Sequence, residues 1–189
     1  MIDLQQMKEE GISEEEWKKT TMAMSNGKVV NFFTGSLVID GQNQPSQSLT
    51  LKRGVARFDL NVDVAGSAAI ESLTLRNVAQ SGYLFAQGEV AASPADVERN
   101  DVTAHFDTAL SASTPGVLYV YEQENAGIEV SIEAVIDGQH KVLTKTLEGN
   151  LKRNTIYTVT VRKNDIDIVV KVGIDDWEPG EDTEIIPQL

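Results

Sequence analysis

In the stretch VARFDLNVDV, residues 55–64, apolar and polar side chains alternate from Ala56 to the end. The apolar positions are Ala56, Phe58, Leu60, Val62 and Val64. Successive side chains of a β-strand point to opposite faces of its sheet, so this period of two predicts a strand with one dry face and one wet face. That pattern is typical of antiparallel sheets that pack on a single side.

The same alternation recurs along the chain, in IEVSIEAVI (128–136) and DIDIVVKVGI (165–174). The last third is predicted to be a meander of about four antiparallel strands, with turns at Asp137-Gly138 and at Lys163-Asn164. Further strands are predicted at 29–33, 36–39, 70–77, 83–87, 102–106 and 117–121. Two such sheets face to face form a sandwich, so the predicted fold class is all-β, with antiparallel β-sandwiches.

One helix is predicted, in GISEEEWKKTTMAM near the N-terminus. Ser13 and Glu16 have the spacing of a capping box, and Ile12 and Trp17 occupy the staple positions. A helix this short is marginal unless it docks, so we expect a small packed or frayed leader. A partner-binding helix is the alternative.

The segment GEVAASPADVERND, residues 88–101, has the small, polar composition of a linker. We therefore expect a leader at 1–27, one sandwich domain at 28–92, a linker at 93–101 and a second sandwich domain at 102–180. The remaining residues, 181–189, form an acidic tail.

Composition excludes several classes of function. The net charge of −13 disfavours nucleic acid and anionic membranes as partners. The chain has no cysteine, which excludes disulfides and thiolate sites. The start, MIDLQQMKEEG, shows no signal peptide, and no apolar run reaches the ~20 residues of a membrane-spanning helix.

No catalytic, cofactor or metal site is predicted. His105 and His140 are far apart in sequence, and no phosphate loop or nucleophile elbow occurs. The acids of DDWEPGED, residues 175–182, are suitable calcium donors but lack the spacing of a calcium loop. The sequence therefore gives no positive argument for an enzyme.

The tripeptide LKR occurs twice, at 51–53 and 151–153. The apolar face that follows Arg153 is one residue out of step with the face that follows Arg53, and such a slip reverses every side chain. The repeat therefore does not indicate a duplicated domain. Each copy marks the basic start of a long strand.

Four segments in order, LTLKRGVARFDLNV (49–62), LYVYEQ (118–123), LKRNTIYTVTV (151–161) and VKVGIDDWEPG (170–180), resemble the Bacteroidetes fimbrillin superfamily. The likeness is closest to its accessory, anchor or tip-type subunits. It implies two tandem transthyretin-like β-sandwich domains in a structural and adhesive subunit of a surface fimbrium. It places the chain at the cell surface or outer membrane, with other fimbrial subunits and a host or bacterial surface receptor as partners.

The resemblance also implies maturation by an arginine-specific protease. Removal of a leading strand would open a groove, and a neighbouring subunit would fill it by β-strand addition. Arg53 is the first candidate for cleavage and Arg57 the second, with the lost strand inside 29–39. The alternative is an exposed arginine that is not processed.

A carbohydrate-binding β-sandwich module at the cell surface is the competing hypothesis. Such modules present aromatic platforms to sugars, and Trp177 and Trp17 are the two candidates outside the predicted strands. Tyr119, Tyr121 and Tyr157 are in phase with strand faces, which favours packing in the core.

Overall fold

The computed structural model describes residues 9–37 and 48–172, and almost all of its regular structure is β. The first strands are β1 (Thr21–Ala23), β2 (Phe33–Thr34), β3 (Lys52–Arg53), β4 (Val55–Val62), β5 (Ala68–Ala79) and β6 (Ser81–Tyr83). The others are β7 (Arg99–Leu110), β8 (Thr114–Tyr121), β9 (Glu129–Ile136), β10 (Gln139–Thr146), β11 (Thr155–Val161) and β12 (Ile166–Val172).

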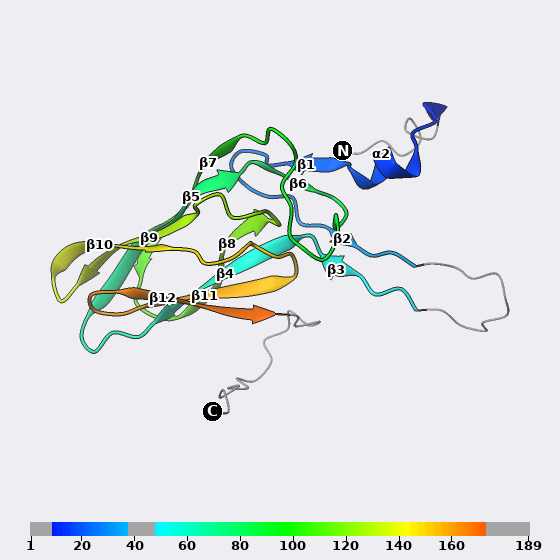
Figure 1. The fold of residues 1–189 in the computed structure, drawn as a ribbon. Coiled ribbons are helices and arrows are strands. Elements are labelled where there is room, and N and C mark those ends of the chain that lie inside the picture. The colour runs from blue at the N-terminus through cyan, green and yellow to red at the C-terminus, as the bar shows by residue number, and fades with distance from the viewer. Residues whose placement is uncertain (1–8, 38–47, 173–189) are drawn as a thin grey trace.

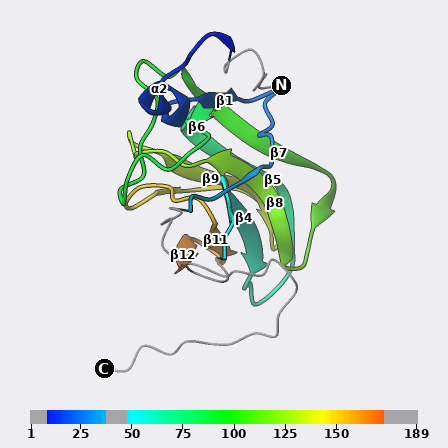
Figure 2. The same ribbon diagram turned by 90° about the vertical axis from the view of Figure 1, so that its right-hand side faces the viewer.

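Two four-stranded sheets form a sandwich (Figure 1). One has the order β10-β9-β5-β7 and the other β12-β11-β4-β8. Two small ribbons, β1-β6 and β2-β3, lie at one end of the sandwich, as the view from that end shows (Figure 2). The predicted all-β sandwich class is confirmed.

The two strands that follow the LKR segments lie side by side. β4 and β11 pair in parallel, with Phe58 opposite Tyr157 and Leu60 opposite Val159. These partners are 99 positions apart, whereas the tripeptides are 100 apart. The strand pairing is therefore offset by one residue relative to the two LKR tripeptides. This offset places the apolar side chains of β4 and β11 opposite each other, facing the same core.

A single hydrophobic core fills the space between the sheets and draws on both halves of the chain. Its largest fully buried members include Phe58, Leu73, Ile132, Tyr157 and Ile166. Strands β4 and β5 pair with β8, β9 and β11, which follow the expected boundary region, and with β7, which begins at its end. The expected split into separate sandwiches at 28–92 and 102–180 does not match this pairing.

The segment expected as a linker, 93–101, instead leads into the sheet. β7 begins at Arg99, and just upstream Ala91 is buried. The small polar residues resemble a linker because they carry the chain across the end of the sandwich. The tail expected at 181–189 lies outside the described residues.

The last third is not a simple meander. β9 pairs with β10, and β11 pairs with β12, but the two hairpins belong to opposite sheets. The chain crosses between them at 147–154, where Leu147 and Leu151 are buried. Because these side chains join the core, the crossing is fixed by packing.

The predicted helix is present as α2 (Glu14–Lys18), and its capping box is confirmed. The Ser13 hydroxyl accepts a hydrogen bond from the Glu16 amide at 3.3 Å, and the Ser13 amide donates to the Glu16 carboxylate at 2.9 Å. Several short strands differ from expectation. Of 29–33 only Phe33 is in a strand, and the strand predicted at 83–87 ends at Tyr83. The described part of 36–39 is not a strand.

Candidate functional site

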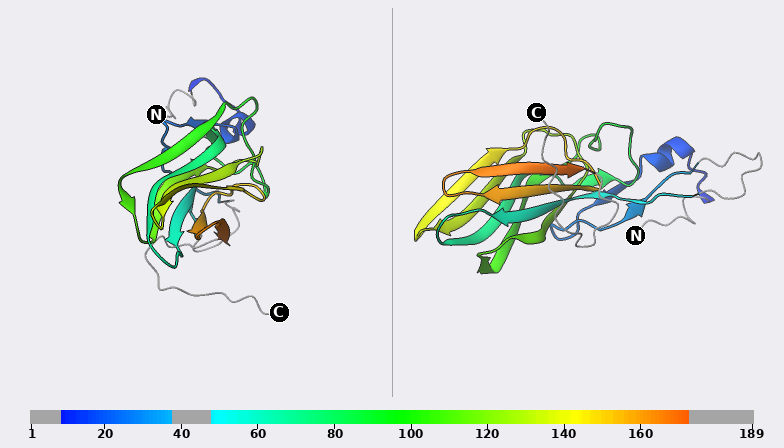
Figure 3. Two further views of the ribbon diagram at one scale, coloured as in Figure 1. Left: turned by 90° about the vertical axis from the view of Figure 1, so that its left-hand side faces the viewer. Right: turned by 90° about the horizontal axis from the view of Figure 1, so that it is seen from below.

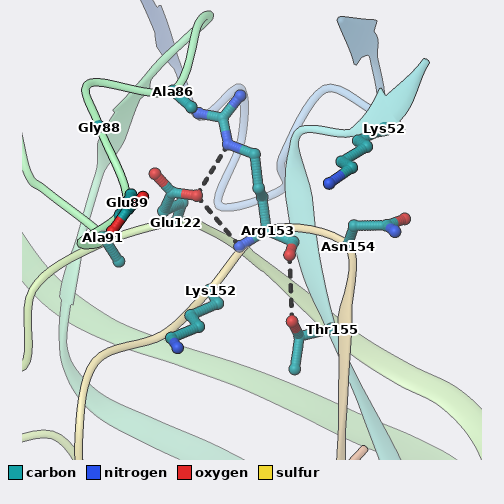
Figure 4. Close-up of a pocket in the computed structure, with 10 residues that line it drawn as sticks. All are labelled: Lys52, Ala86, Gly88, Glu89, Ala91, Glu122, Lys152, Arg153, Asn154 and Thr155. Carbon is teal, nitrogen blue, oxygen red and sulfur yellow. Dashed lines mark hydrogen bonds and ion pairs between the residues drawn. The ribbon is translucent and has the colours of Figure 1, made fainter. Parts of the chain in front are cut away.

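Both LKR segments meet at one open cleft at the end of the sandwich (Figure 4). The cleft has a volume of about 390 Å³. It is lined by Lys52, Ala86, Gly88, Glu89, Ala91, Glu122, Lys152, Arg153, Asn154 and Thr155.

A buried ion pair lies in the wall of this cleft. Arg153 Nε donates to Glu122 Oε2 at 2.8 Å, and both side chains are 9% exposed. The same carboxylate oxygen accepts the Arg153 amide at 3.2 Å. The pair therefore fixes the start of β11 against the end of β8.

The two terminal nitrogens of the Arg153 guanidinium bind segments that lie over this end of the sandwich. They donate to the carbonyls of Leu84 and Tyr83, both at 3.0 Å, and to the Thr34 hydroxyl at 3.3 Å. Each guanidinium nitrogen thus has an acceptor. The arrangement holds β2, β6, β8 and β11 together.

Sequence reasoning placed Arg153 at a strand start but did not identify its role or that of Glu122. The available signal was the recurrence of LKR together with the acid in LYVYEQ. The sequence signal does not show that Arg153 and Glu122 are buried, because their burial depends on distant parts of the chain around Thr34 and at 83–84.

Residues 20–34 form a cap over the end of the sandwich. The Tyr121 hydroxyl accepts the Val30 amide at 2.8 Å and donates to the Ala23 carbonyl at 3.2 Å. Burial raises the pKa of Tyr121. Phe32 packs against Tyr121 and lies so close to Gly54 that a Cβ there would overlap its ring.

Arg53 lies at the base of a projecting ribbon. Among the described strands, β2 and β3 pair only with each other, with Phe33 opposite Arg53. The Arg53 guanidinium carbon lies 4.6 Å from the Phe33 ring centroid. No four-stranded sheet contains a described strand that precedes Arg53. A cut here would leave both large sheets complete, so the expected groove would not open in them.

Arg57 is placed quite differently. It lies inside β4, with β8 on one side and β11 on the other, and its guanidinium contacts Asp59 at 2.7 Å. Its side chain is 15% exposed. A protease needs an extended accessible segment, so the structure favours Arg53 over Arg57 as a cleavage position.

The structure does not bring the two tryptophans together as a platform. Trp17 on α2 is half-buried and packs against Phe85 with ring centroids 5.5 Å apart. Trp177 lies outside the described residues. The glycan-platform hypothesis stays a prediction.

Tyr157 is buried in the core, as its phase predicted. The prediction is wrong for Tyr119, which is half-buried and lies, like Tyr121, on the face of β8 opposite the core residues. Tyr121 is buried by the cap instead.

The four outer strands of the sandwich differ in how well they resist pairing with another chain. Natural edge strands are protected by proline, bulges and inward-pointing charges. β8 contains Pro115 and a register shift opposite Phe58–Leu60, and β7 has two register shifts against β5. On β10, Lys141 and Lys145 flank buried Leu143 on the inward face.

Of the features that protect edge strands, β12 has only charged residues in its sequence, Asp167 and Lys171. Its sequence, IDIVVKV, contains no proline, and its register with β11 is unbroken. β12 lies at the edge of its sheet, as the orange strand in Figure 3 shows. Val170 lies opposite buried Tyr157, on the core side of the sheet, yet it is 43% exposed. Val169 on the outer side is 47% exposed. Of the four outer strands in the described part of the chain, β12 therefore has the most exposed large apolar side chains.

Two ion pairs join the two sheets beside the first residues of β12. Lys145 Nζ lies 3.0 Å from Asp167 on β12, and Lys163 Nζ lies 2.6 Å from Asp137. The hydrogen bonds from these lysines hold the pKa values of Asp167 and Asp137 below their usual range. These contacts join the two sheets near the start of β12 and leave its Val169–Val170 part uncovered.

No group of histidines and acids in the described part of the chain is arranged to hold a metal ion. Across 9–37 and 48–172, no helix has the length and apolar character to span a membrane. The acids of 175–182 lie outside the described residues.

Comparisons with solved structures give the same architecture. The tip fimbrial protein Mfa3 of Porphyromonas gingivalis, with a C-terminal truncation, is 14% identical, with a TM-score of 0.54. The match covers 90% of this chain and 76% of that one. A protein of Bacteroides eggerthii DSM 20697 assigned to cell adhesion is 12% identical, with a TM-score of 0.55 over 84% of this chain and 70% of that one. At these identities the likeness shows the fold.

A third match, a protein of Bacteroides uniformis ATCC 8492 also assigned to cell adhesion, is 13% identical with a TM-score of 0.45. It covers 67% of this chain, which spans about half, 52%, of the other. No curated protein matches the sequence. The family described as Fimbrillin-A associated anchor proteins Mfa1 and Mfa2 matches residues 12–183. Because this match covers nearly the whole chain, the chain belongs to the Fimbrillin-A associated anchor protein family.

Proposed function

We propose that this chain is a structural and adhesive subunit of a bacterial surface fimbrium and joins its neighbours by β-strand addition. Membership of the fimbrial anchor family supports the fimbrial role. The observation that supports this mode of assembly is the exposure of Val169 and Val170 on the edge strand β12. The role is non-enzymatic, and its site is the cell surface, at the outer membrane.

Strand addition at β12 has a clear physical basis. An edge strand presents unpaired amides and carbonyls, which an extended segment can pair. Backbone hydrogen bonds then supply affinity, and alternate side chains supply register. An added strand would also cover Val170, whose apolar side chain is on the core side but half uncovered.

The proposed partners are other fimbrial subunits, with a surface receptor as the target of adhesion. Processing after Arg53 is proposed as the maturation step. It would separate the capping segment from β4 while both four-stranded sheets keep their strands.

The test compares two matched substitutions on different edges, Val169→Lys on β12 and Val142→Lys on β10. Both positions are exposed, so both variants should fold. Each variant is expressed in a fimbriated host that lacks the wild-type subunit, and sheared fimbriae are analysed for it. We expect Val169→Lys to be missing from fimbriae and Val142→Lys to be incorporated, because an edge lysine blocks strand pairing.

Hydrogen exchange supplies the second measurement. Amides of β12 should become protected in assembled fimbriae relative to the free subunit, while those of β8 should change little. Normal incorporation of Val169→Lys, with unchanged exchange in β12, would refute strand addition at this edge. Absence of the wild-type chain from fimbriae would refute the fimbrial role itself.

A further inference from the structure

A projecting arm, formed by residues 30–37 and 48–53, extends beyond the sandwich (Figures 1 and 3). Its exposed large apolar side chains are Val30, Phe33, Leu37, Leu49 and Leu51, each between 40% and 54% exposed. Exposed apolar side chains gathered in one place indicate an interaction surface. The arm is therefore a candidate contact of the intact chain.

The distribution of exposed apolar side chains links the arm to β12. The described residues include nine exposed large apolar side chains: five on the arm, two on β12, and the isolated Val90 and Val142. Seven of the nine thus lie on two surfaces. The two isolated valines provide matched controls.

The second segment of the arm has the pattern of an added strand. In SLTLKR, residues 48–53, apolar Leu49 and Leu51 alternate with polar Thr50 and Lys52. β2 and β3 pair only with each other among the described strands, and over two residues. Most of the arm's backbone therefore has no sheet partner in the part of the chain that the structure describes.

Charge identifies the kind of partner. The two segments of the arm contain two bases, Lys52 and Arg53, and no acid. The other 175 residues hold 14 bases and 29 acids, which gives them a charge of −15. A basic, apolar arm is thus attached to a strongly acidic chain, and this difference in charge favours the approach of the arm to a second copy.

We propose that the arm of one copy adds as an extended strand to the β12 edge of a second copy. This inference rests on the proposed assembly by strand addition and names its donor. Leu49 and Leu51 would lie along Val169 or Val170 according to register, because alternate side chains of the added strand face one side. Donor and acceptor are different surfaces, so the contact can propagate from copy to copy.

Engineered disulfides test this contact, since the chain has no cysteine of its own. Leu51→Cys protein is mixed with Val169→Cys protein and oxidised, and the mixed dimer is quantified by mass spectrometry. We expect it to form several-fold faster than the dimers of Leu51→Cys with Val142→Cys or with Val90→Cys. Equal rates for all three pairs, as random collision would give, overturn the proposal.

Sedimentation velocity of the intact chain supplies the second readout. The double variant Leu49→Asp/Leu51→Asp should lose self-association, and Val90→Asp should keep it. The arm lies outside both large sheets, so circular dichroism should show these variants folded. A wild-type chain that stays monomeric and gives no preferred crosslink contradicts the second copy as partner.

The two proposals can fail separately. If Leu49→Asp/Leu51→Asp enters fimbriae normally while Val169→Lys does not, strand addition at β12 stands and the arm is not its donor. If Val169→Lys also enters normally, strand addition at β12 fails as well.

Discussion

The rings of Phe58 and Tyr157 stack with centroids 5.1 Å apart and planes 17° apart. The two residues are register partners on the parallel strands β4 and β11, and both are fully buried. This contact joins the first large strand to the last third of the chain at the centre of the core.

Phe58→Ala is expected to lower the free energy of unfolding by about 3–5 kcal/mol, because it removes a buried ring and leaves a cavity. Urea unfolding should show one transition, since one core contains both halves of the chain. The control is Val142→Ala at a 62% exposed position, which should change stability by less than about 0.5 kcal/mol. Two separate transitions, with only one affected, would indicate independent halves.

High pH should destabilise the fold through its buried tyrosines. Burial raises the pKa of Tyr157 and of Tyr121 above the value of about 10 in an unfolded chain. Because the folded-state pKa is raised, the contribution of these protonated tyrosines to the free energy of unfolding is fully present below about pH 10. It is lost as the pH rises through the folded-state pKa. Absorbance titration should show Tyr121 and Tyr157 ionising late.

The Tyr157 hydroxyl provides the specific check. It accepts the Lys152 amide at 2.9 Å and donates to the Asn150 carbonyl at 3.1 Å. Tyr157→Phe should therefore cost about 1–3 kcal/mol at neutral pH and leave one late-titrating tyrosine. A variant that still shows two would mean that the assignment to Tyr157 is wrong.

Arg153→Met should loosen the cap as well as destabilise the sandwich. It leaves the Glu122 carboxylate buried without its partner, a change that costs about 3–5 kcal/mol. Hydrogen exchange should rise in residues 20–34 and in β6, because the Arg153 bonds to Thr34, Leu84 and Tyr83 are lost.

The control for that variant is Arg76→Met. Arg76 lies 3.5 Å from Glu129, and both side chains are substantially exposed, so the loss should be about 1 kcal/mol or less. Similar exchange of the cap in both variants would exclude Arg153 as its anchor.

Arg-specific digestion should cut after Arg53 before it cuts after Arg57, which is inside a central strand. Arg162 is exposed near the β11–β12 turn, so the substrate should carry Arg162→Gln. Mass spectrometry should find a fragment that begins at Gly54, and its melting should stay cooperative because no strand of the large sheets is removed. Arg53→Gln should abolish this cut.

A first cut after Arg57, or loss of cooperative melting on cleavage after Arg53, would contradict this prediction. The first result would show that β4 opens readily. The second would show that the cap contributes to the core in a way that the pairing does not reveal.

The sequence predicted the long strands well, because alternation records which face of a strand is buried. The buried apolar residues of β4 and β9 follow it, and the capping box located α2 within a residue. In β11, six of the seven residues are buried, so alternation does not describe that strand. Alternation does not record which strands are neighbours. The parallel pairing of Phe58 with Tyr157 and the placement of β10 and β11 in opposite sheets therefore could not be read from it.

The site was harder to predict than the strands. Arg153 and Glu122 have ordinary sequence surroundings, and their burial depends on β2 and the segment after β6, which are distant in sequence. Arg53 was identified from its place before a long strand. The sequence did not show that the strands preceding it belong to a separate ribbon.

The neighbours of β4 have a consequence for biogenesis. Its two sheet partners begin at Thr114 and Thr155, so this strand stays unpaired until most of the chain has left the ribosome. Closing such long loops is entropically costly, and domains rich in distant contacts fold in roughly milliseconds to seconds. A nascent chain of this protein is therefore expected to remain open, and within reach of chaperones, until β11 has been synthesised.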